Sequence, residues 1–316
     1  MATVPSGDIQ ENSDGLSDQD RAFISDFLSE NSVTDASGTF VLVNTDTTIP
    51  GSQTYTLLQA GADSVTGSSN GDFVVGNSSD NVMTGLAGNE TMFGGDGADT
   101  VDGGDDNDVL YGGGGSDSVV GGNGDDEMYG NAGSDVLSGG AGNDVLYGGQ
   151  GSDTVTGGDG DTMFGNRGSD MVQGDATEQK AYGNQDADTI EAGGGNDTAF
   201  GGKGNDIVDG GSGNDEIHGN SGDDTLTGGA GSDTFVYLRS TDGNDTILDF
   251  TIGTDVIQIS QALRPDGVTN PSQLTVTTSG SDVVIQLAGD ASITLSDLDE
   301  ADVVAQLENI VQFITL

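Results

Sequence analysis

An apolar position recurs every nine residues between 58 and 236, inside the motif G-G-x-G-x-D-x-U-x, where U is a large apolar residue. A clean copy runs from Gly139 to Tyr147, and twenty units fill the segment, with the unit at 157–164 one residue short. Position 8 is apolar in every unit, from Val65 to Phe235. Because neighbouring side chains of a strand point to opposite faces, x-U-x predicts a three-residue strand with U in the core. Positions 1 to 6 are then expected to form the turn.

Aromatic residues indicate that the structural period is eighteen. They recur at position 9 of every second unit, whereas the units between them have other residues there. One nonapeptide supplies one strand and one turn, so two are needed to close a coil. The pattern predicts an all-β, right-handed parallel β-roll, a solenoid with two nonapeptides per coil and two unlike sheets. The aromatic residues are Phe93, Tyr111, Tyr129, Tyr147, Phe164, Tyr182 and Phe200.

The composition indicates that such a roll needs a cation. The formal net charge is -48 over 316 residues, with six Lys plus Arg and 32% hydrophobic residues, and a chain of this kind does not offset its conformational entropy alone. Because the chain has no basic patch, it is not expected to bind nucleic acid. For the same reason of charge, it is not expected to bind an anionic membrane surface. The absence of Cys excludes disulfides, zinc–thiolate sites and Cys nucleophiles.

Aspartate at position 6 supplies the candidate ligands. In stacked coils these carboxylates would lie about 5 Å apart and repel one another by roughly 3 kcal/mol per pair. A hard cation with about six to eight oxygen ligands removes this repulsion, and Ca²⁺ suits flexible, carbonyl-rich turns better than Mg²⁺. The candidate calcium ligands are Asp63, Asp72, Asp99, Asp108, Asp117, Asp126, Asp135, Asp144, Asp153, Asp161, Asp170, Asp188, Asp197, Asp206, Asp215, Asp224, Asp233, Asp245 and Asp255.

The repeat segment resembles the RTX (repeats-in-toxin) family, which has the hemolysin-type calcium-binding nonapeptide. The resemblance implies many Ca²⁺ ions, each bound by position-6 Asp residues and turn carbonyls of units eighteen residues apart. It also implies secretion by a type I exporter of a chain that stays unfolded until it meets extracellular calcium. Position 6 is Asn81, Glu90 or Gln179 in three units, and the short unit places Asp161 directly after Gly160. We expect calcium binding to fail first at Gln179 and Asp161.

The flanks of the repeats predict caps. Residues 1–57 have a capping-box pattern ahead of an apolar helix face, which predicts a helix at about 18–30. Strands are expected at 39–43 and 55–58. We interpret this region as a cap over the first coil of the β-roll at 58–236, with a partner-docking helix as the alternative.

Residues 237–316 resemble the C-terminal domain common to type I-exported RTX proteins. We expect them to form a mixed β/α cap with strands at 274–277, 283–287 and 292–295. The apolar stretch Leu307–Leu316 is similar to an uncleaved export signal, and as an ordinary terminal strand it would complete the cap.

No motif predicts catalysis. The G-x-S-x-G match at 67–71 needs a strand-to-helix elbow but lies in a predicted turn, and the single His218 takes a position-9 slot. The first residues lack the pattern of a cleaved secretory signal, and no apolar run approaches the roughly 20 residues of a membrane span.

The sequence therefore predicts a secreted, non-enzymatic calcium-binding protein, extracellular or at the cell surface, that folds on meeting calcium. Its expected role is that of a surface, matrix or interaction protein. The aromatic row either only stabilises its sheet or also contacts a glycan or protein. The alternatives are a membrane-active, pore-forming accessory protein and a non-catalytic remnant of an RTX enzyme.

Overall fold

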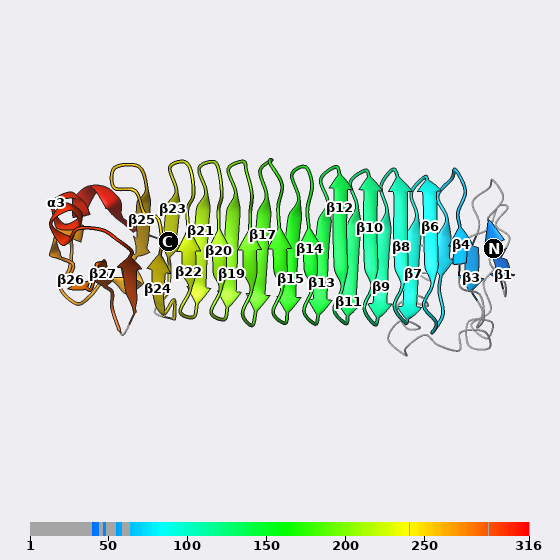
Figure 1. The fold of residues 1–316 in the computed structure, drawn as a ribbon, viewed down its shortest axis with the longest axis horizontal. Helices are drawn as coiled ribbons and strands as arrows, with labels where there is room; N and C mark the ends of the chain where they lie inside the picture. The colour runs from blue at the N-terminus through cyan, green and yellow to red at the C-terminus, as the bar shows by residue number, and fades with distance from the viewer. Residues whose placement is uncertain are drawn as a thin grey trace. The chain divides into compact units, whose positions relative to one another are not determined.

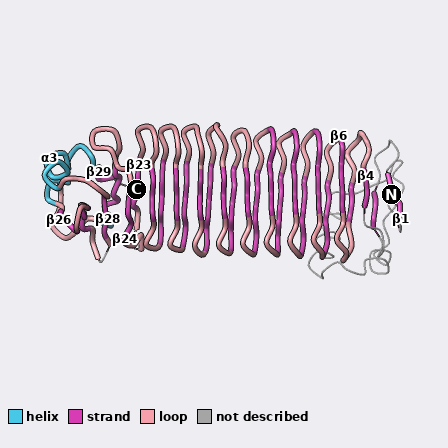
Figure 2. Tube along the Cα trace, viewed as in Figure 1, coloured by secondary structure: helices cyan, strands magenta, loops and turns pink. Residues whose placement is uncertain are grey.

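The protein forms two compact units, Met1–Asp153 and Thr154–Leu316, and short parallel strands build two sheets in each (Figure 1). The computed structural model describes residues 64–239, 241–289 and 291–315, together with the strands at 40–43, 47–48 and 55–58. The predicted helix at about 18–30 lies outside these residues. Strand and turn alternate along the chain, since each repeat supplies one of each (Figure 2).

In the described part of the first unit, neighbouring strands pair in parallel. The predicted strands at 39–43 and 55–58 are confirmed as β1 and β3, which belong to the same sheet as the repeat strands. One sheet has the order β1 (Phe40–Val43), β3 (Tyr55–Leu58), β5 (Phe73–Val75), β7 (Thr91–Asp96), β9 (Val109–Gly114), β11 (Glu127–Ala132) and β13 (Val145–Gln150). The other has the order β2 (Thr47–Thr48), β4 (Ser64–Thr66), β6 (Val82–Ala87), β8 (Thr100–Asp105), β10 (Ser118–Asn123) and β12 (Val136–Ala141).

The second unit repeats this arrangement and ends in a mixed region. One sheet has the order β15 (Thr162–Arg167), β17 (Lys180–Gln185), β19 (Thr198–Lys203), β21 (Glu216–Ser221), β23 (Thr234–Tyr237), β25 (Val256–Ser260) and β29 (Val311–Ile314). The other has the order β14 (Thr154–Thr156), β16 (Met171–Gln173), β18 (Thr189–Glu191), β20 (Ile207–Asp209), β22 (Thr225–Thr227), β24 (Asn244–Ile247), β28 (Ser292–Leu295), β27 (Asp282–Gln286) and β26 (Val276–Ser279). The last two strands of that order, β27 and β26, pair antiparallel.

The register confirms the period of eighteen. Met128 on β11 pairs with Leu110 on β9 and with Leu146 on β13, so identical repeat positions stack. These three side chains have 0% exposure, as expected for position 8. Stacked apolar side chains between two sheets therefore form the core of each unit.

Most repeat strands are longer than the predicted three residues. In β9, for example, the strand runs on through the first three turn positions, and burial alternates so that Leu110 and Gly112 both face inward. A Cβ on Gly112 would stand 2.6 Å from Asp117 Oδ2 and 2.9 Å from the Gly130 carbonyl oxygen. The second inward position can thus continue the strand only because glycine has no side chain there.

The C-terminal cap corrects two expectations. The strand expected at 274–277 begins at Val276, because Pro271–Gln273 forms the 3-10 turn η2, closed by an Asn270 capping box. Leu307–Leu316 is not a single strand, because its first four residues end the helix α3 (Glu300–Ile310) and β29 follows at Val311. A second 3-10 turn, η1, spans Gln261–Leu263.

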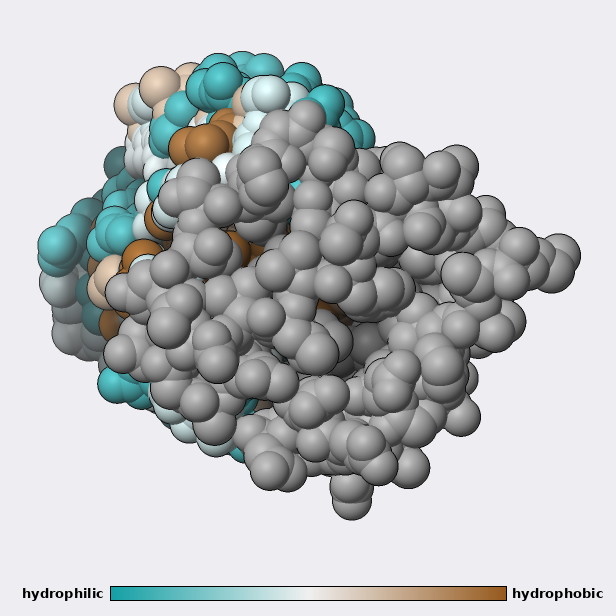
Figure 3. Space-filling model, turned by 90° about the vertical axis from the view of Figure 1, so that its right-hand side faces the viewer, coloured by the Kyte–Doolittle hydropathy of each residue, from teal (hydrophilic) through white to brown (hydrophobic). Residues whose placement is uncertain are grey.

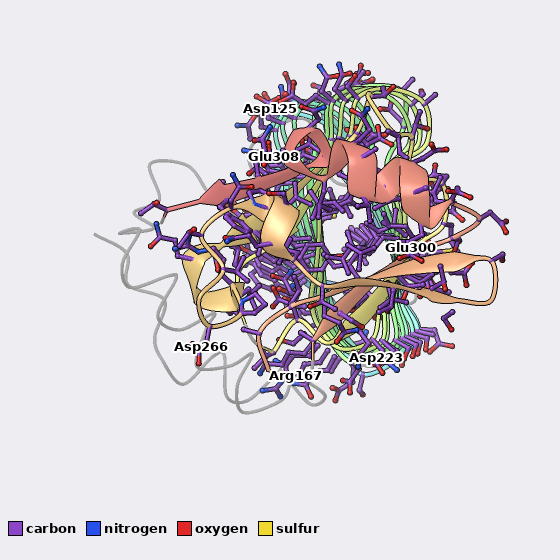
Figure 4. The ribbon with its side chains drawn as sticks, turned by 90° about the vertical axis from the view of Figure 1, so that its left-hand side faces the viewer. Asp125, Arg167, Asp223, Asp266, Glu300 and Glu308 are labelled. Carbon is purple, nitrogen blue, oxygen red and sulfur yellow. The ribbon has the colours of Figure 1, made fainter. Side chains whose placement is uncertain are left out.

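Helix α3 closes the second unit with one apolar face. Asp299 caps its N-terminus by accepting a hydrogen bond from the Ala301 N–H. Val303, Leu307 and Ile310 are buried, at the spacing of one helix face. Figure 4 shows α3 at this end of the unit, with Glu300 and Glu308 at its opposite ends.

Two adjacent residues of β12 test the core assignment. Leu137 has 0% exposure and Val136 has 50%. We expect Leu137→Ala to lower the free energy of unfolding by about 2–5 kcal/mol through the cavity it leaves. The matched control Val136→Ala should change it by less than about 0.5 kcal/mol. Urea denaturation of both variants provides the measurement, and equal shifts would contradict the inward placement of position 8.

Candidate metal centre

Position-6 aspartates form a hydrogen-bonded ladder along each row of turns. The Asp99 N–H donates to Asp117 Oδ1 at 2.8 Å, and the Asp117 N–H donates to Asp135 Oδ1 at 2.9 Å. The second unit repeats the contact, with the Asp188 N–H on Asp206 Oδ1 at 2.9 Å. One carboxylate oxygen of each of these acceptors is therefore occupied by the backbone N–H eighteen residues earlier.

The other carboxylate oxygen is buried without a donor in many turns. Burying a charged oxygen without a partner is costly, so these atoms require a cation or a proton. Oδ2 atoms with no hydrogen-bond partner include those of Asp99, Asp117, Asp135, Asp188, Asp197, Asp206, Asp215, Asp224 and Asp233.

Backbone carbonyls face these free oxygens. A point 2.7 Å from Asp215 Oδ2, where a Cβ on Gly210 would stand, lies 2.9 Å from the Gly228 carbonyl oxygen of the next coil. The geometry at Gly112 in the first unit is the same. Each such turn thus places an acidic oxygen and a carbonyl oxygen from two successive coils around one point.

This donor set fits Ca²⁺. Among the residues that the structure describes, no three His, Asp or Glu side chains converge as a metal cluster. The carboxylate oxygens and the carbonyl oxygens of neighbouring coils form an all-oxygen donor set, which a hard cation accepts. The turn residues would hold the ion, and the ion would supply the positive charge that the buried carboxylates lack.

Burial dominates the electrostatics of the ladder. It raises the pKa of Asp117 to about 6, of Asp135 to about 7 and of Asp188 to about 8. Neighbouring carboxylates of the same row raise the pKa of Asp135 and Asp188 further, while hydrogen bonds from backbone N–H groups lower it. Burial, together with the neighbouring carboxylates of Asp224 and Asp242, raises the pKa of Asp245 to about 9. Without a cation, these groups keep their protons to a higher pH than an ordinary Asp does.

Exposed acids on the same turns behave differently. Asp125 Oδ1 accepts a hydrogen bond from the Asn143 N–H at 2.9 Å, and this contact lowers the pKa of Asp125. In the second unit, Asp223 Oδ1 accepts one from the Asn244 N–H, and Figure 4 shows Asp223 at the turn edge. Solvent and turn donors satisfy this outer row, so only the inner row calls for a cation.

Several predicted ligands stand in a second kind of turn. Asp72 Oδ2 accepts from the Ser68 N–H at 2.7 Å, and Asp255 Oδ2 accepts from the Thr251 N–H at 2.7 Å. Asp161 Oδ2 likewise accepts from the Gly158 N–H. In these turns, a donor of the same turn already contacts the inner oxygen. Asp63 lies outside the described residues.

Glu90 is a further candidate calcium ligand, although it departs from the Asp expected at position 6 of the repeat. Its carboxylate is buried beside Asp108, and burial together with Asp108 raises its pKa to about 9. The Glu90 N–H continues the ladder by donating to Asp108 Oδ1 at 2.8 Å. Its position in the repeat could have indicated this role, because the longer carboxylate side chain of Glu can occupy position 6 in place of Asp.

The aromatic row is a ladder of stacked rings. Tyr111 stacks on Tyr129 with centroids 4.7 Å apart and 4° between the planes, and Tyr182 stacks on Phe200 at 4.9 Å and 3°. His218 joins the second row, 4.3 Å from Phe200, and its Nε2 lies 2.8 Å from Glu216 Oε1. Each inner ring therefore has both faces covered by its neighbours.

The G-x-S-x-G match does not form a nucleophile elbow. Ser68 lies in a turn between two strands, has 5% exposure, and its hydroxyl donates to the Asn70 carbonyl oxygen at 3.2 Å. This agrees with the turn expected from the repeat pattern.

Parallel strands joined by glycine-rich turns, each with one buried carboxylate facing carbonyls, define a calcium-type β-roll. The profile of the RTX calcium-binding nonapeptide repeat, in its four-copy form, matches residues 59–92, 66–101, 93–128, 129–162, 155–176, 182–217, 201–235 and 209–247. These matches cover more than half of the chain, and the protein belongs to the RTX calcium-binding nonapeptide repeat family. The predicted family and the all-β, parallel β-roll are therefore confirmed.

Two solved structures are similar to parts of the chain. The AlgE6R3 subunit of the Azotobacter vinelandii mannuronan C5-epimerase is 27% identical, with a TM-score of 0.23 over 43% of this chain and 78% of that one. The extracellular lipase LipA of Serratia marcescens is 16% identical, with a TM-score of 0.28 over 89% of this chain and 45% of that one. No curated protein shows significant similarity. In the part of the chain that the structure describes, no helix is long and apolar enough to span a membrane.

The raised pKa values predict that acid stabilises the calcium-free fold. Carboxyls with a folded pKa of about 6 to 8 and an ordinary value of 3.8 bind more protons in the folded state. Their stabilising contribution is complete below pH 4 and is lost as pH rises through about 8. In excess chelator, the β-sheet circular dichroism signal should therefore fall over this window, and saturating calcium should abolish the fall.

Sedimentation of the same samples controls for association near the isoelectric point, where low net charge favours aggregation. A chelated protein that gains β structure as pH rises would contradict the buried position of the ladder.

Proposed function

We propose that the inner carboxylates of the roll bind Ca²⁺ and that calcium switches the chain from unfolded to folded outside the cell. The observation that carries this proposal is the set of buried Oδ2 atoms, such as those of Asp117 and Asp215, that have no donor and face carbonyls of the next coil. The proposed ligands are the position-6 aspartates of the repeats, except Asp72 and Asp161, whose inner oxygens accept hydrogen bonds within their own turns. Asp245 is added to them, because its Oδ1 extends the ladder from the Asp224 N–H. Family membership supports calcium as the ion.

The charge of the whole chain supports a switch. The chain has six Lys plus Arg and 54 Asp plus Glu, so its basic side chains cannot neutralise its acidic ones. Where described residues are visible in Figure 3, hydrophilic residues dominate the surface and apolar ones form small patches. An acidic chain with so little apolar surface to bury gains its stability from bound cations, by mass action on the folded state.

The C-terminal region supports secretion of an unfolded chain. In the folded second unit, Leu307, Ile310 and Val311 are buried. An exporter could therefore bind this apolar segment only before the unit folds. We accordingly propose a type I export signal at the C-terminal end of the region 237–316, with 58–236 as the calcium-binding β-roll and 1–57 as its N-terminal cap.

The extracellular role that we propose is structural, as a surface, matrix or interaction protein rather than an enzyme. The ring faces of the aromatic ladder cover one another, so a sugar would meet ring edges and not the faces on which it could stack. This geometry favours the stabilising role of the ladder over a glycan platform.

Circular dichroism with and without calcium tests the switch. At neutral pH, we expect a disordered spectrum in chelator and a β spectrum at millimolar calcium. The protons that stabilise the calcium-free fold in acid are being lost at this pH, and the ion then offsets the repulsion in the inner rows. Magnesium at the same concentration is the control and should be far less effective. A β spectrum in excess chelator at neutral pH would refute calcium-dependent folding.

Removing three stacked rings tests the ladder. We expect Tyr111→Thr, Tyr129→Thr and Tyr147→Thr together to lower stability by about 0.2–1 kcal/mol per lost pair. Adhesion of the calcium-loaded protein to glycan-coated surfaces should not change. Val120→Thr, at position 9 of the other sheet, is the matched control. Lost adhesion with unchanged stability would favour a binding platform instead.

A further inference from the structure

Gln179 stands at position 6 of a turn whose inner side chain is an amide instead of a carboxylate. It has 1% exposure, and its backbone N–H continues the ladder by donating to Asp197 Oδ1 at 2.7 Å. Its Oε1 accepts from the Asp161 N–H at 2.9 Å, which is the bond that an Asp Oδ1 accepts in the other turns. Gln179 therefore takes the ordinary place of the ladder residue.

The amide nitrogen of Gln179 lies among oxygens of two successive coils. It donates to the Gly158 carbonyl oxygen at 2.6 Å, to Asp175 Oδ1 at 2.8 Å and to Thr177 Oγ1 at 3.0 Å. Gly158 belongs to the preceding coil, whereas Asp175 and Thr177 belong to the turn of Gln179 itself. In the turns that have Asp at position 6, the corresponding atom is a carboxylate oxygen, so the polarity is reversed here.

The surrounding residues complete this arrangement. The Thr177 N–H and hydroxyl both donate to Asp175 Oδ1, at 2.8 Å and 2.9 Å, and the Gly160 N–H donates to Thr177 Oγ1 at 2.9 Å. Asp161 Oδ2 is occupied by the Gly158 N–H. A cation at this point would have to displace several hydrogen bonds and would find fewer charged oxygens.

The missing residue of the short unit is absorbed in the facing turn of the preceding coil. Val155 pairs with Val172, seventeen residues on, whereas Met163 pairs with Ala181, eighteen residues on. The turn at 157–161 is thus one residue tighter, and the strands on both sides keep their register. The tighter turn places the Gly158 carbonyl within reach of the Gln179 amide.

We propose that the Gln179 amide replaces a calcium ion between the coils at 157–164 and 174–182. We call this pair of turns, held together by hydrogen bonds without the ion, a calcium-independent joint in the roll. This rests on the proposed function, because a replacement has meaning only where neighbouring turns bind the ion. The two N–H groups of the amide supply positive hydrogens to oxygens that a cation would otherwise bind. Neither Gln179 nor Asp161 is then a calcium ligand, and the row of ions in the second unit is interrupted here.

An isosteric substitution tests the joint. Gln179→Glu converts the donating nitrogen into a carboxylate oxygen that faces Asp175 Oδ1 and the Gly158 carbonyl. We expect it to bind about one more Ca²⁺ per chain than the wild type, as a restored acidic turn should. It should also need severalfold more calcium to reach half of its folding signal, since like charges now meet where a hydrogen bond stood. Calcium counted after equilibrium dialysis and circular dichroism during calcium titration provide the two readouts.

Two further variants define the alternatives. Gln179→Met removes the donor without adding charge, so it should keep the wild-type calcium count and raise the calcium needed for folding. Gln185→Glu makes the same chemical change on an exposed side chain and should alter neither readout. If Gln179→Met binds one ion fewer than the wild type, or if Gln179→Glu matches the wild type in both readouts, the joint is refuted. If the wild type and Gln185→Glu do not fold on calcium at all, the proposed function fails instead.

Discussion

The fold of both units depends on one contact, in which the backbone N–H of a position-6 residue donates to the side-chain oxygen at position 6 of the next coil, in most repeats a carboxylate oxygen eighteen residues later. This bond ties successive coils together and also stacks like charges in a buried row. Burial then raises the pKa of these acids, and the inner carboxylate oxygens face carbonyls rather than donors. The contact that organises the roll is therefore the contact that makes it depend on a cation.

Glycine at position 1 is the second constraint that the fold requires. The strand continues past the core residue into the turn, and a Cβ at Gly112 would press against Asp117 Oδ2 and the Gly130 carbonyl oxygen. The space thus freed is lined with oxygen atoms. The glycine-rich turns and the acidic ladders consequently depend on each other, since the absent side chain leaves room where the oxygen atoms converge.

Not every turn in the rows has a buried carboxylate oxygen without a donor. Asp72, Asp161 and Asp255 have their inner oxygen bonded to an N–H of the same turn, and Gln179 has a donor in its place. The repeat pattern marked Gln179 and the short unit of Asp161. It could not mark Asp72 and Asp255, because Asp at position 6 looks the same in both kinds of turn. Glu90 shows the converse, since a departure from consensus still buries a carboxylate in the ladder.

The sequence alone determined the family, the parallel β-roll, the period of eighteen and the inward position of residues such as Leu110 and Met128, because a short exact repeat leaves one way to stack apolar positions in register. The strands at 40–43 and 55–58 also followed from local pattern. Only the tertiary structure decided how far each strand enters its turn, where the helix at Glu300–Ile310 ends, and which inner oxygens lack a donor. Those features depend on contacts between coils, which residue spacing along one unit does not specify.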